Sequence, residues 1–414
     1  MSERGDSIDR VVLINDFSKV RGGAAALVVL LAEKLTEMKI KVTLITGDDG
    51  RDLQGEIDGI EVVSLNEPPL LSRPLIAAVT KGLYNPSSGR MLSDWISRND
   101  TAKTIYHVHN WSHILSASIF RPLHVVNRRT VMHAHDYFLA CPNGAFANYR
   151  TGKECTLRPL SFACLSTNCD RRNYSQKLWR AARHRIRQAF WDFENYKTDV
   201  LMIHERMRES FERSGIARSQ LLTIRNPSVP YSDSRIPAED NQEYVFIGRI
   251  EEEKGVSDFL NAARKAGAPA RVIGEGSTLR ELAEQFPEVR FDGWQPRAGI
   301  AELIKSARML VVPSRYPEPF GLVIMESLAS GIPVILPHSA LLKAEVTHQE
   351  IGIACDTGSI DELAQVIQSS GMDDEKIASM SRTAFSLRDN LAVDPRIWTA
   401  QIVSYYRTLL SRST

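Results

Sequence analysis

Short runs of apolar residues alternate with helical patterns along most of this chain. In the first half, this pattern predicts strands at residues 11–15, 41–46, 60–65, 104–109, 130–135 and 199–204. In the second half, it predicts strands at residues 244–248, 270–274, 289–293, 309–313 and 333–336. Strands that are apolar throughout and alternate with helices are typical of parallel sheets covered on both faces. The chain is therefore predicted to be an α/β protein.

Two sets of such strands predict two doubly wound domains, which suits 414 residues at roughly 100–200 residues per domain. The polar stretch at 232–243 is predicted to link them, because polar segments with few apolar residues are typical of domain boundaries. We expect an N-terminal domain at 1–230 and a C-terminal domain at 231–393. A final helix at 394–414 is expected to pack back on the N-terminal domain.

Composition and charge narrow the class of protein. Apolar residues make up 43% and charged residues 24%, as in ordinary globular proteins. Lys and Arg number 51 against 50 Asp and Glu, so no overall positive field indicates nucleic acid binding. No apolar run approaches the ~20 residues of a membrane span, and the first residues lack a secretory apolar segment. We therefore expect a cytoplasmic protein that could still lie on the inner face of a membrane.

Four of the five cysteines fall close together, in an insertion predicted at about 140–190. They are Cys141, Cys155, Cys164 and Cys169. Stable disulfides are not expected in a reducing compartment. Two interpretations stay open: a long loop with unpaired thiols, or a structural metal held by four thiolates, although the spacings are wider than the short pairs of zinc modules.

The stretch at 312–334 reads VPSRYPEPFGLVIMESLASGIPV and places two carboxylates around the start of one helix. Pro319 suits a first helical position, because its missing N–H would have no intrahelical partner there. Glu318 then lies at the mouth of the helix, and Glu326 lies two turns in. The apolar runs on either side predict a strand–loop–helix–strand unit.

This arrangement indicates an anion site with hydroxyl-binding groups beside it. A helix N-terminus favours anions, so a phosphate is expected at the amides of Phe320, Gly321 and Leu322. Glu318 and Glu326 are expected to accept hydrogen bonds from hydroxyls on either side of the phosphates. The ligand that fits is a nucleotide sugar. The alternative is an ordinary helix with two carboxylates that face solvent.

The spacing of these residues resembles the donor site of the family 4 retaining glycosyltransferases. The resemblance rests on Glu318 and Glu326 with seven residues between them, PFG after the first, and G-x-P-V-I after the second. It implies the GT-B fold, in which two Rossmann-like doubly wound domains face an interdomain cleft. It covers most of the chain and is strongest from Tyr244 to Ile353.

Two further segments of the second half match the same family. Gly248 ends a predicted strand in the segment FIGRIEEEKG, at residues 246–255. The resemblance implies that Arg249 and Lys254 of this segment contact the donor phosphates. Two cations there would offset the charge of a diphosphate. VIGEGS, with Gly274 and Gly276, resembles an element that lines the nucleotide cleft. The alternative for the first segment is a basic turn on the surface, and the alternative for the second is a routine glycine turn after a strand.

In the first half, Gly22 and Gly23 precede an apolar helix and resemble the glycine loop that lies between donor and acceptor. HDY resembles a strand-end element whose histidine, here His135, hydrogen-bonds the transferred sugar, and Asp136 follows it. His109 is a candidate for the acceptor side. The two H-x-H pairs also suggest a metal, but the resemblance implies no metal requirement, so no metal ligand is predicted.

The stretch at 171–193 is strongly basic and interleaved with aromatic residues. Its cations are Arg171, Arg172, Lys177, Arg180, Arg183, Arg185 and Arg187. A basic helix of this kind can lie on an anionic membrane surface, which would give access to a lipid-linked acceptor. A solvated helix face, whose aromatic residues pack on the domain, is the alternative.

Together these observations predict a hexosyltransferase of the EC 2.4 class. It would move a sugar from a nucleotide-diphosphate donor to a glycan or lipid-linked acceptor, in surface polysaccharide biosynthesis, with retention and without a required cofactor. The groups expected to act on the reacting atoms are His135, Arg249, Lys254 and Glu318. The alternatives are a nucleotide-sugar epimerase of the same fold and a non-catalytic protein that binds a nucleotide sugar or a membrane.

Overall fold

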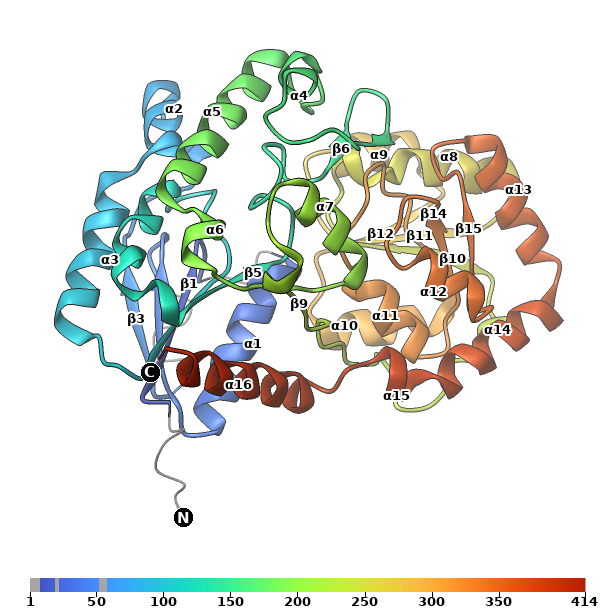
Figure 1. Cartoon of the computed structure of the whole chain (residues 1–414). Coiled ribbons are helices and arrows are strands. Elements are labelled where there is room, and N and C mark those ends of the chain that lie inside the picture. The colour runs from blue at the N-terminus through green and yellow to red at the C-terminus, as the bar shows by residue number, and fades with distance from the viewer. Residues whose placement is uncertain (1–7, 19–21, 52–57, 414) are drawn as a thin grey trace. The chain divides into compact units, whose positions relative to one another are not determined.

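The computed structural model describes residues 8–18, 22–51 and 58–413, which form two compact units (Figure 1). Unit 1 comprises Met1–Phe146, Cys155–Asn226 and Pro395–Thr414, and unit 2 comprises Ala147–Glu154 and Pro227–Asp394. The C-terminal helix thus belongs to unit 1. The polar stretch at 232–243 lies inside unit 2, where the Ile236 N–H donates to the Ser330 carbonyl, rather than between the units.

In the described part of unit 1, a sheet of parallel strands runs in the order β3-β2-β1-β4-β5-β8-β9. The strands are β1 (Arg10–Asn15), β2 (Lys41–Thr46), β3 (Ile60–Ser64), β4 (Thr104–Val108), β5 (Thr130–Ala134), β8 (Val200–Met202) and β9 (Leu221–Thr223). β1 is central and pairs Val11 with Val42 of β2 and with Ile105 of β4. All three side chains are buried, as expected of apolar strands covered on both faces.

Some helices of unit 1 begin where sequence signals favour a start. The helices of this unit are α1 (Gly23–Glu37), α2 (Leu75–Leu83), α3 (Pro86–Asn99), α4 (Phe162–Ser166), α5 (Tyr174–Phe190), α6 (Phe193–Tyr196), α7 (Arg208–Arg213) and α16 (Pro395–Ser411). The Asn85 side chain caps α3 ahead of Pro86, and the Asn173 side chain caps α5.

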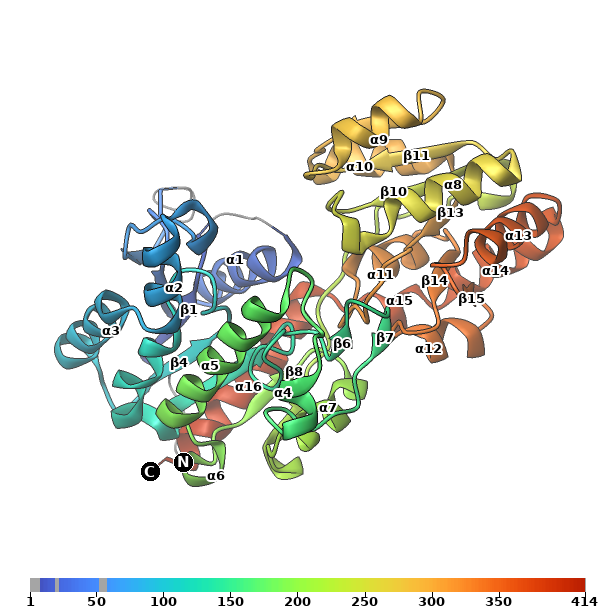
Figure 2. The same cartoon turned by 90° about the horizontal axis from the view of Figure 1, so that it is seen from above.

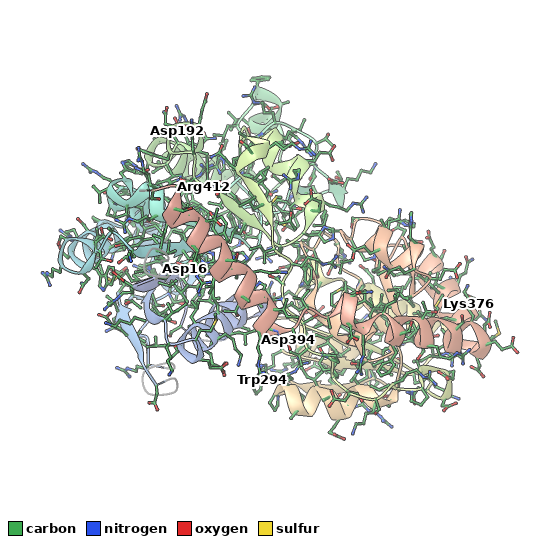
Figure 3. The ribbon with its side chains drawn as sticks, turned by 60° about the horizontal axis from the view of Figure 1, so that its bottom comes forward. Asp16, Asp192, Trp294, Lys376, Asp394 and Arg412 are labelled. Carbon is green, nitrogen blue, oxygen red and sulfur yellow. The ribbon has the colours of Figure 1, made fainter. Side chains whose placement is uncertain are left out.

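Helix α16 is fixed to unit 1 along its length. It packs against α1 and carries Arg412 just past its end (Figure 3). The Tyr405 hydroxyl donates to Asp199 at 3.0 Å, and Arg412 lies 3.1 Å from the same carboxylate. The Tyr406 hydroxyl lies 2.5 Å from Nδ1 of His107 in β4. The end of the chain therefore takes part in the core of the N-terminal unit.

In the described part of unit 2, the parallel strands run in the order β12-β11-β10-β13-β14-β15. They are β10 (Glu243–Ile247), β11 (Ala270–Ile273), β12 (Arg290–Gly293), β13 (Ala307–Val311), β14 (Val334–Pro337) and β15 (Gly352–Cys355). A short antiparallel hairpin from the cysteine-containing insertion, β6 (Ala147–Asn148) and β7 (Lys153–Glu154), also groups with this unit.

Helices cover the unit 2 sheet, and α8 and α13 lie side by side (Figure 2). The helices are α8 (Val256–Ala266), α9 (Leu279–Gln285), α10 (Arg297–Leu303), α11 (Leu322–Ala329), α12 (Lys343–His348), α13 (Ile360–Gly371), α14 (Asp374–Ser386) and α15 (Arg388–Leu391). Phe259 and Leu260 of α8 and Leu363 and Ile367 of α13 are buried in one core. This core holds the strands whose ends carry the candidate site.

The predicted α/β class and its strands are confirmed. Each strand expected from an apolar run is present, with its ends shifted by at most a few residues. β9, β15 and the hairpin were not predicted. In both units the strand order reverses beside the first strand, between β1 and β4 and between β10 and β13. Ligands of open α/β sheets bind outside the carboxyl ends of strands at such a point.

Candidate functional site

The loops after β10, β11 and β13 meet at the carboxyl edge of the unit 2 sheet. Glycines permit this approach: a Cβ on Gly274 would lie 1.9 Å from the carbonyl oxygen of Gly248. A Cβ on Gly276 would lie 2.1 Å from the carbonyl oxygen of Ile250. Gly274 and Gly276 therefore have a packing role that the sequence did not reveal, and the contact of these two and of Gly248 with a ligand stays a prediction.

Gly255 precedes α8 with a φ of 69°, and a Cβ there would lie 2.0 Å from the carbonyl oxygen of Pro313. We expect Gly255→Ala to lose roughly 1–2 kcal/mol through its left-handed backbone and more through displacement of the loop after β13. Gly267→Ala is a matched control, because Gly267 has a φ of 65° and no neighbour within 4 Å of its Cβ. Thermal denaturation should show the lower melting temperature for Gly255→Ala. Equal melting temperatures would contradict the close packing of these loops.

Lys254 and Glu318 form a largely buried ion pair in this site. Lys254 Nζ lies 2.5 Å from Glu318 Oε1, and the Ser314 hydroxyl also donates to this carboxylate. Burial alone would raise the pKa of Glu318, but Lys254 and Ser314 outweigh it, so the pKa is lowered. Burial alone would lower the pKa of Lys254, but Glu318 reverses this, so the pKa is raised. Both groups are therefore charged near neutral pH.

Arg249 brings a second cation to the same loop. Its side chain is exposed, and among the described residues it has no hydrogen-bond or ion-pair partner. Its positive charge contributes to the lowered pKa of Glu318. The ammonium of Lys254 lies over the ring of Tyr316, with Nζ 5.2 Å from the ring centroid. The site therefore holds one cation that is paired with a carboxylate and one that is available to an anion.

A clamp that sequence reasoning missed holds the loop after β13. Arg315 donates two hydrogen bonds of 2.7 Å to Asp258 near the start of α8. The Arg315 N–H also donates to the Glu253 carbonyl at 2.9 Å. Arg–carboxylate pairs of this kind fix geometry as well as adding energy. These contacts position Ser314 and Tyr316 around the ion pair.

The expected start of the next helix is wrong by about one turn. α11 begins at Leu322, and Pro319 and Phe320 lie in the preceding loop. Gly321 caps the helix with φ 71° and ψ 73°, a left-handed conformation that favours glycine. Glu326 is consequently about one turn into α11 rather than two. A helix N-terminus favours anions, and a phosphate at the start of α11 stays a prediction.

Glu326 is held by two partners that the sequence did not indicate. The Tyr231 hydroxyl donates to Glu326 Oε2 at 2.8 Å, and Arg297 Nη1 donates to Glu326 Oε1 at 2.7 Å. The Arg297 guanidinium also lies 5.0 Å from the centroid of the Tyr231 ring. An ionised carboxylate has about four acceptor sites, so Glu326 keeps capacity for a ligand hydroxyl.

At the corresponding edge of unit 1, Asp16 follows β1 and is buried. Its carboxylate accepts hydrogen bonds from the N–H groups of His113, Ile114 and Leu115, at 2.7, 2.8 and 2.9 Å. Gly23 begins α1, preceded by Gly22 with nothing within 4 Å of the position of a Cβ. Asp16 therefore fixes the loop after β4, a role that the sequence did not predict.

His109 and His135 lie in contact at the ends of β4 and β5. His109 Nδ1 is 2.9 Å from His135 Nε2, and both side chains are buried. Burial lowers the pKa of His135 to about 3, so its imidazole is neutral. Burial also raises the pKa of Asp136 to about 6, although its carboxylate accepts the Phe138 N–H at 2.8 Å. The structure thus brings His109 and His135 together, beside Asp136, with His135 as a neutral hydrogen-bonding group. Among the described residues, no hydrogen bond joins them to Gly22 or Gly23.

The clustered cysteines surround an ammonium group. Lys177 Nζ donates to the sulfurs of Cys164 and Cys169, both at 3.3 Å, and Lys177 is almost fully buried. Cys141 donates to Asn143 at 3.1 Å, and no cysteine forms a disulfide in the described chain. The described residues hold one group of three potential metal ligands within 4.8 Å, and it contains no sulfur. This geometry favours free thiols over a site of four thiolates.

The basic stretch forms α5, but much of its charge is directed inward. Lys177, Arg183 and Arg187 are buried. Arg183 donates to the Ser112 carbonyl at 2.9 Å, and Arg187 donates to the Leu139 carbonyl. These cations therefore hold loops of unit 1 and are not available to a membrane. In the part of the chain that the structure describes, no helix is both long and apolar enough to cross a bilayer.

Two family models match the chain, one in each half. The model "Glycosyltransferase Family 4" matches residues 21–227, and the model "Glycosyl transferases group 1" matches residues 232–386. Glycogen synthase of Mycobacterium tuberculosis is 26% identical over 288 residues, which are 64% of this chain and 65% of that protein. The uncharacterized glycosyltransferase YqgM of Bacillus subtilis is 27% identical over 64% of this chain and 75% of its own length.

Solved structures agree on the fold. Sucrose-phosphate synthase from Thermosynechococcus elongatus aligns with a TM-score of 0.70 at 16% identity, over 98% of this chain and all of that chain. HepE of Anabaena, determined in complex with UDP, aligns with a TM-score of 0.66 at 17% identity, over 96% of this chain and all of that chain. The two parallel α/β units thus have the GT-B architecture expected from the sequence. With one family model matching half of its length and the other most of the remainder, the chain belongs to glycosyltransferase family 4.

Proposed function

We propose that this protein transfers a sugar from a nucleotide-diphosphate sugar to a glycan or lipid-linked acceptor, with retention of anomeric configuration, in assembly of a surface polysaccharide. One observation carries the proposal: Arg249, Lys254 and the glycine-capped start of α11 occur together at the switch point of unit 2. A diphosphate is the ligand that two cations and a helix N-terminus complement.

The same groups suit the departure of a diphosphate. Negative charge grows on the leaving phosphate as the bond to the sugar breaks, and fixed cations stabilise it without reorganisation. Lys254 donates one N–H to Glu318, and an ammonium has three N–H groups. Lys254 can therefore also donate to the diphosphate. Glu318 would then accept a sugar hydroxyl, and Glu326, held by Tyr231 and Arg297, would accept from the ribose.

Retention without a carboxylate nucleophile requires the leaving diphosphate to take the proton of the attacking acceptor hydroxyl. In this scheme the new glycosidic bond forms on the face that the diphosphate leaves, and the proton passes to a phosphate oxygen. We propose that His135, neutral and with Nδ1 lacking a described partner, hydrogen-bonds the sugar. His109 would orient His135 through their 2.9 Å contact.

Names of related proteins support the substrate class without fixing the base. HepE was determined with UDP and glucose, and a GDP-mannose-dependent α-mannosyltransferase of Corynebacterium glutamicum is 24% identical over 41% of this chain. A thermal-shift screen against UDP-, GDP- and ADP-sugars tests the proposal. A bound ligand stabilises the folded state by an amount that grows with the logarithm of its concentration relative to its Kd, so donors with one base should raise the melting temperature. No shift with any of them would contradict the proposal.

For the lipid-linked acceptor, we propose a membrane-facing surface on unit 1 other than the buried cations of α5. It consists of Leu71, Leu75, Ile76 and Val79, which are 75%, 79%, 80% and 40% exposed. This surface lies beside α5, because Trp179 donates to the Val79 carbonyl at 3.1 Å. Apolar side chains on α2 and on the turn before it, next to a basic helix, suit the interface of an anionic bilayer.

Flotation with vesicles tests this surface. The wild-type protein should float with anionic vesicles at low salt, and less with neutral ones. Ile76→Asp should lose most of the flotation, because it places a charge in the apolar surface. Ile397→Asp changes an exposed residue of α16 (57% exposed) and should float as the wild type does. Absence of wild-type flotation at low salt would remove the membrane proposal.

A further inference from the structure

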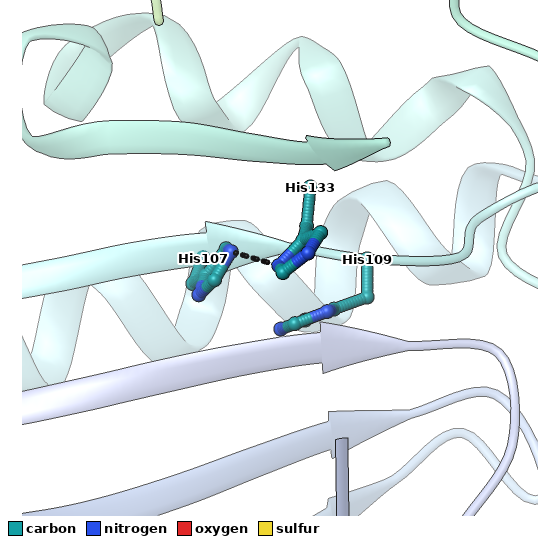
Figure 4. A group of neighbouring side chains, drawn as sticks. All are labelled: His107, His109 and His133. Carbon is teal, nitrogen blue, oxygen red and sulfur yellow. Dashed lines mark hydrogen bonds between the residues drawn. The ribbon is translucent and has the colours of Figure 1, made fainter. Parts of the chain in front are cut away.

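Three imidazoles gather inside unit 1, where β4 and β5 end (Figure 4). His107 belongs to β4, His109 follows it, and His133 belongs to the adjacent β5. Their relative exposures are 0%, 4% and 1%. One ring nitrogen from each lies within 4.8 Å of the other two. Three potential ligands from two neighbouring strands thus converge on one small volume.

The closest nitrogens have the spacing of metal ligands. His107 Nε2 lies 3.2 Å from His133 Nδ1. Two imidazole nitrogens that bind one tetrahedral ion at ~2.0–2.1 Å lie about 3.4 Å apart. The spacing of this pair is therefore close to that of two ligands of one ion, and a nitrogen of His109 lies within 4.8 Å of both.

Two nitrogens of the group lack a partner. Nε2 of His109 and Nε2 of His133 are buried, and neither has a hydrogen-bond partner among the described residues. An unsatisfied buried polar atom costs about 1–3 kcal/mol. A bound ion would satisfy His109 Nε2 directly.

In His107 and His109, a hydrogen bond at Nδ1 leaves Nε2 for an ion. The Tyr406 hydroxyl lies 2.5 Å from His107 Nδ1, which leaves Nε2 of that ring for an ion. His135 Nε2 lies 2.9 Å from His109 Nδ1 and does the same for His109. Metal-binding histidines are held in this way, by a hydrogen bond at the other ring nitrogen.

We propose that His107, His109 and His133 bind one divalent transition-metal ion, of which Zn²⁺ is the best match. Imidazole suits Zn²⁺, Cu²⁺ and Ni²⁺, whereas Mg²⁺ and Ca²⁺ prefer the oxygen ligands that this group lacks. The site is separate from the phosphate-binding groups of unit 2, and the ion takes no part in the transfer step. It ties β4 to β5 and thereby holds His109 against His135.

Cobalt(II) substitution and zinc titration of the full-length, tag-free protein test this site. After chelator treatment, we expect calorimetry to show one Zn²⁺ per chain. Co²⁺ should give the visible absorption of a low-coordinate nitrogen site, without the intense near-ultraviolet charge-transfer bands of sulfur ligands. His133→Gln should abolish this binding, and His338→Gln, at an exposed histidine (52% side-chain exposure), should leave it unchanged.

Tyr406→Phe is a second variant that keeps the test decisive if His133→Gln does not fold. It keeps the ring in the core and removes only the hydroxyl that orients His107, so zinc affinity should fall about 10- to 100-fold. No zinc bound to the wild type, binding that survives His133→Gln, or sulfur charge-transfer bands would each overturn the site. Binding of the nucleoside diphosphate alone, which is assigned to unit 2, should be the same in all of these variants, so the two proposals fail separately.

Discussion

Lys254→Ala is expected to lower kcat/KM for the nucleotide-sugar donor by about 10²–10³-fold, as when one group that stabilises transition-state charge is removed. Lys254 is one of two cations at the unit 2 switch point, and its pKa is raised, so it is charged at any working pH. Its loss removes positive charge at the position where the departing diphosphate becomes more negative. Initial rates with the donor found in the thermal-shift screen measure the effect.

Because Lys254 is paired with Glu318, the stability of Lys254→Ala must be measured alongside its activity. Lys254→Ala leaves Glu318 with the Ser314 hydroxyl as a hydrogen-bond donor, and removal of one partner from a buried pair costs up to about 3–5 kcal/mol. Because both side chains are about 15% exposed, we expect less than this. The double variant Lys254→Ala/Glu318→Gln should recover stability but not activity. Lys265→Ala, at a lysine 57% exposed, should keep both. A folded Lys254→Ala enzyme with full activity would contradict the assignment.

Glu326→Gln is expected to lower kcat/KM for the donor by about 10- to 100-fold, which corresponds to a hydrogen bond to a charged group. Glutamine keeps the length of the side chain, and its carbonyl oxygen can still accept from Arg297 or Tyr231. The fold should therefore survive while the ribose loses an ionised acceptor. Donor saturation curves measure the change, which should be mainly in KM.

Two further variants separate binding from positioning at Glu326. Tyr231→Phe removes the hydroxyl that holds Glu326 Oε2 and should give a smaller change in the same direction. Glu302→Gln alters a carboxylate that is 72% exposed on the neighbouring α10 and should leave the kinetics unchanged. An unchanged KM in Glu326→Gln would show that this carboxylate does not touch the donor.

The strands were predictable because their apolar side chains must be buried on both faces of a sheet. Val11 to Ile14 and Val131 to Ala134 are buried, as the pattern required. β9 and β15 escaped prediction for a physical reason. Each is short, at Leu221–Thr223 and Gly352–Cys355, and each lies at the edge of its sheet, where one side has no neighbour. Short edge strands are weak signals, although β12, equally short and at the other edge of the unit 2 sheet, was predicted.

The site was predictable only as far as side chains project from strand ends and helix starts. Lys254, Glu318 and Arg249 could be placed at one edge because parallel strands end together. The partners Tyr231 and Arg297 could not, because they come from segments distant in sequence and are polar residues of ordinary composition. The start of α11 was misplaced since Pro319 satisfies the rule for a first helical residue, whereas Gly321, in a left-handed conformation, is the cap.

A calorimetric titration of nucleoside diphosphates into the wild-type protein and into Lys254→Ala tests the central claim most directly. The claim is that Arg249, Lys254 and the start of α11 bind the donor through its diphosphate. We expect one of UDP, GDP and ADP to bind the wild type and to bind Lys254→Ala much more weakly, with the matching monophosphate weak on both. Equal affinity of wild type and variant for that diphosphate, or no binding of any of the three to the wild type, would contradict the claim.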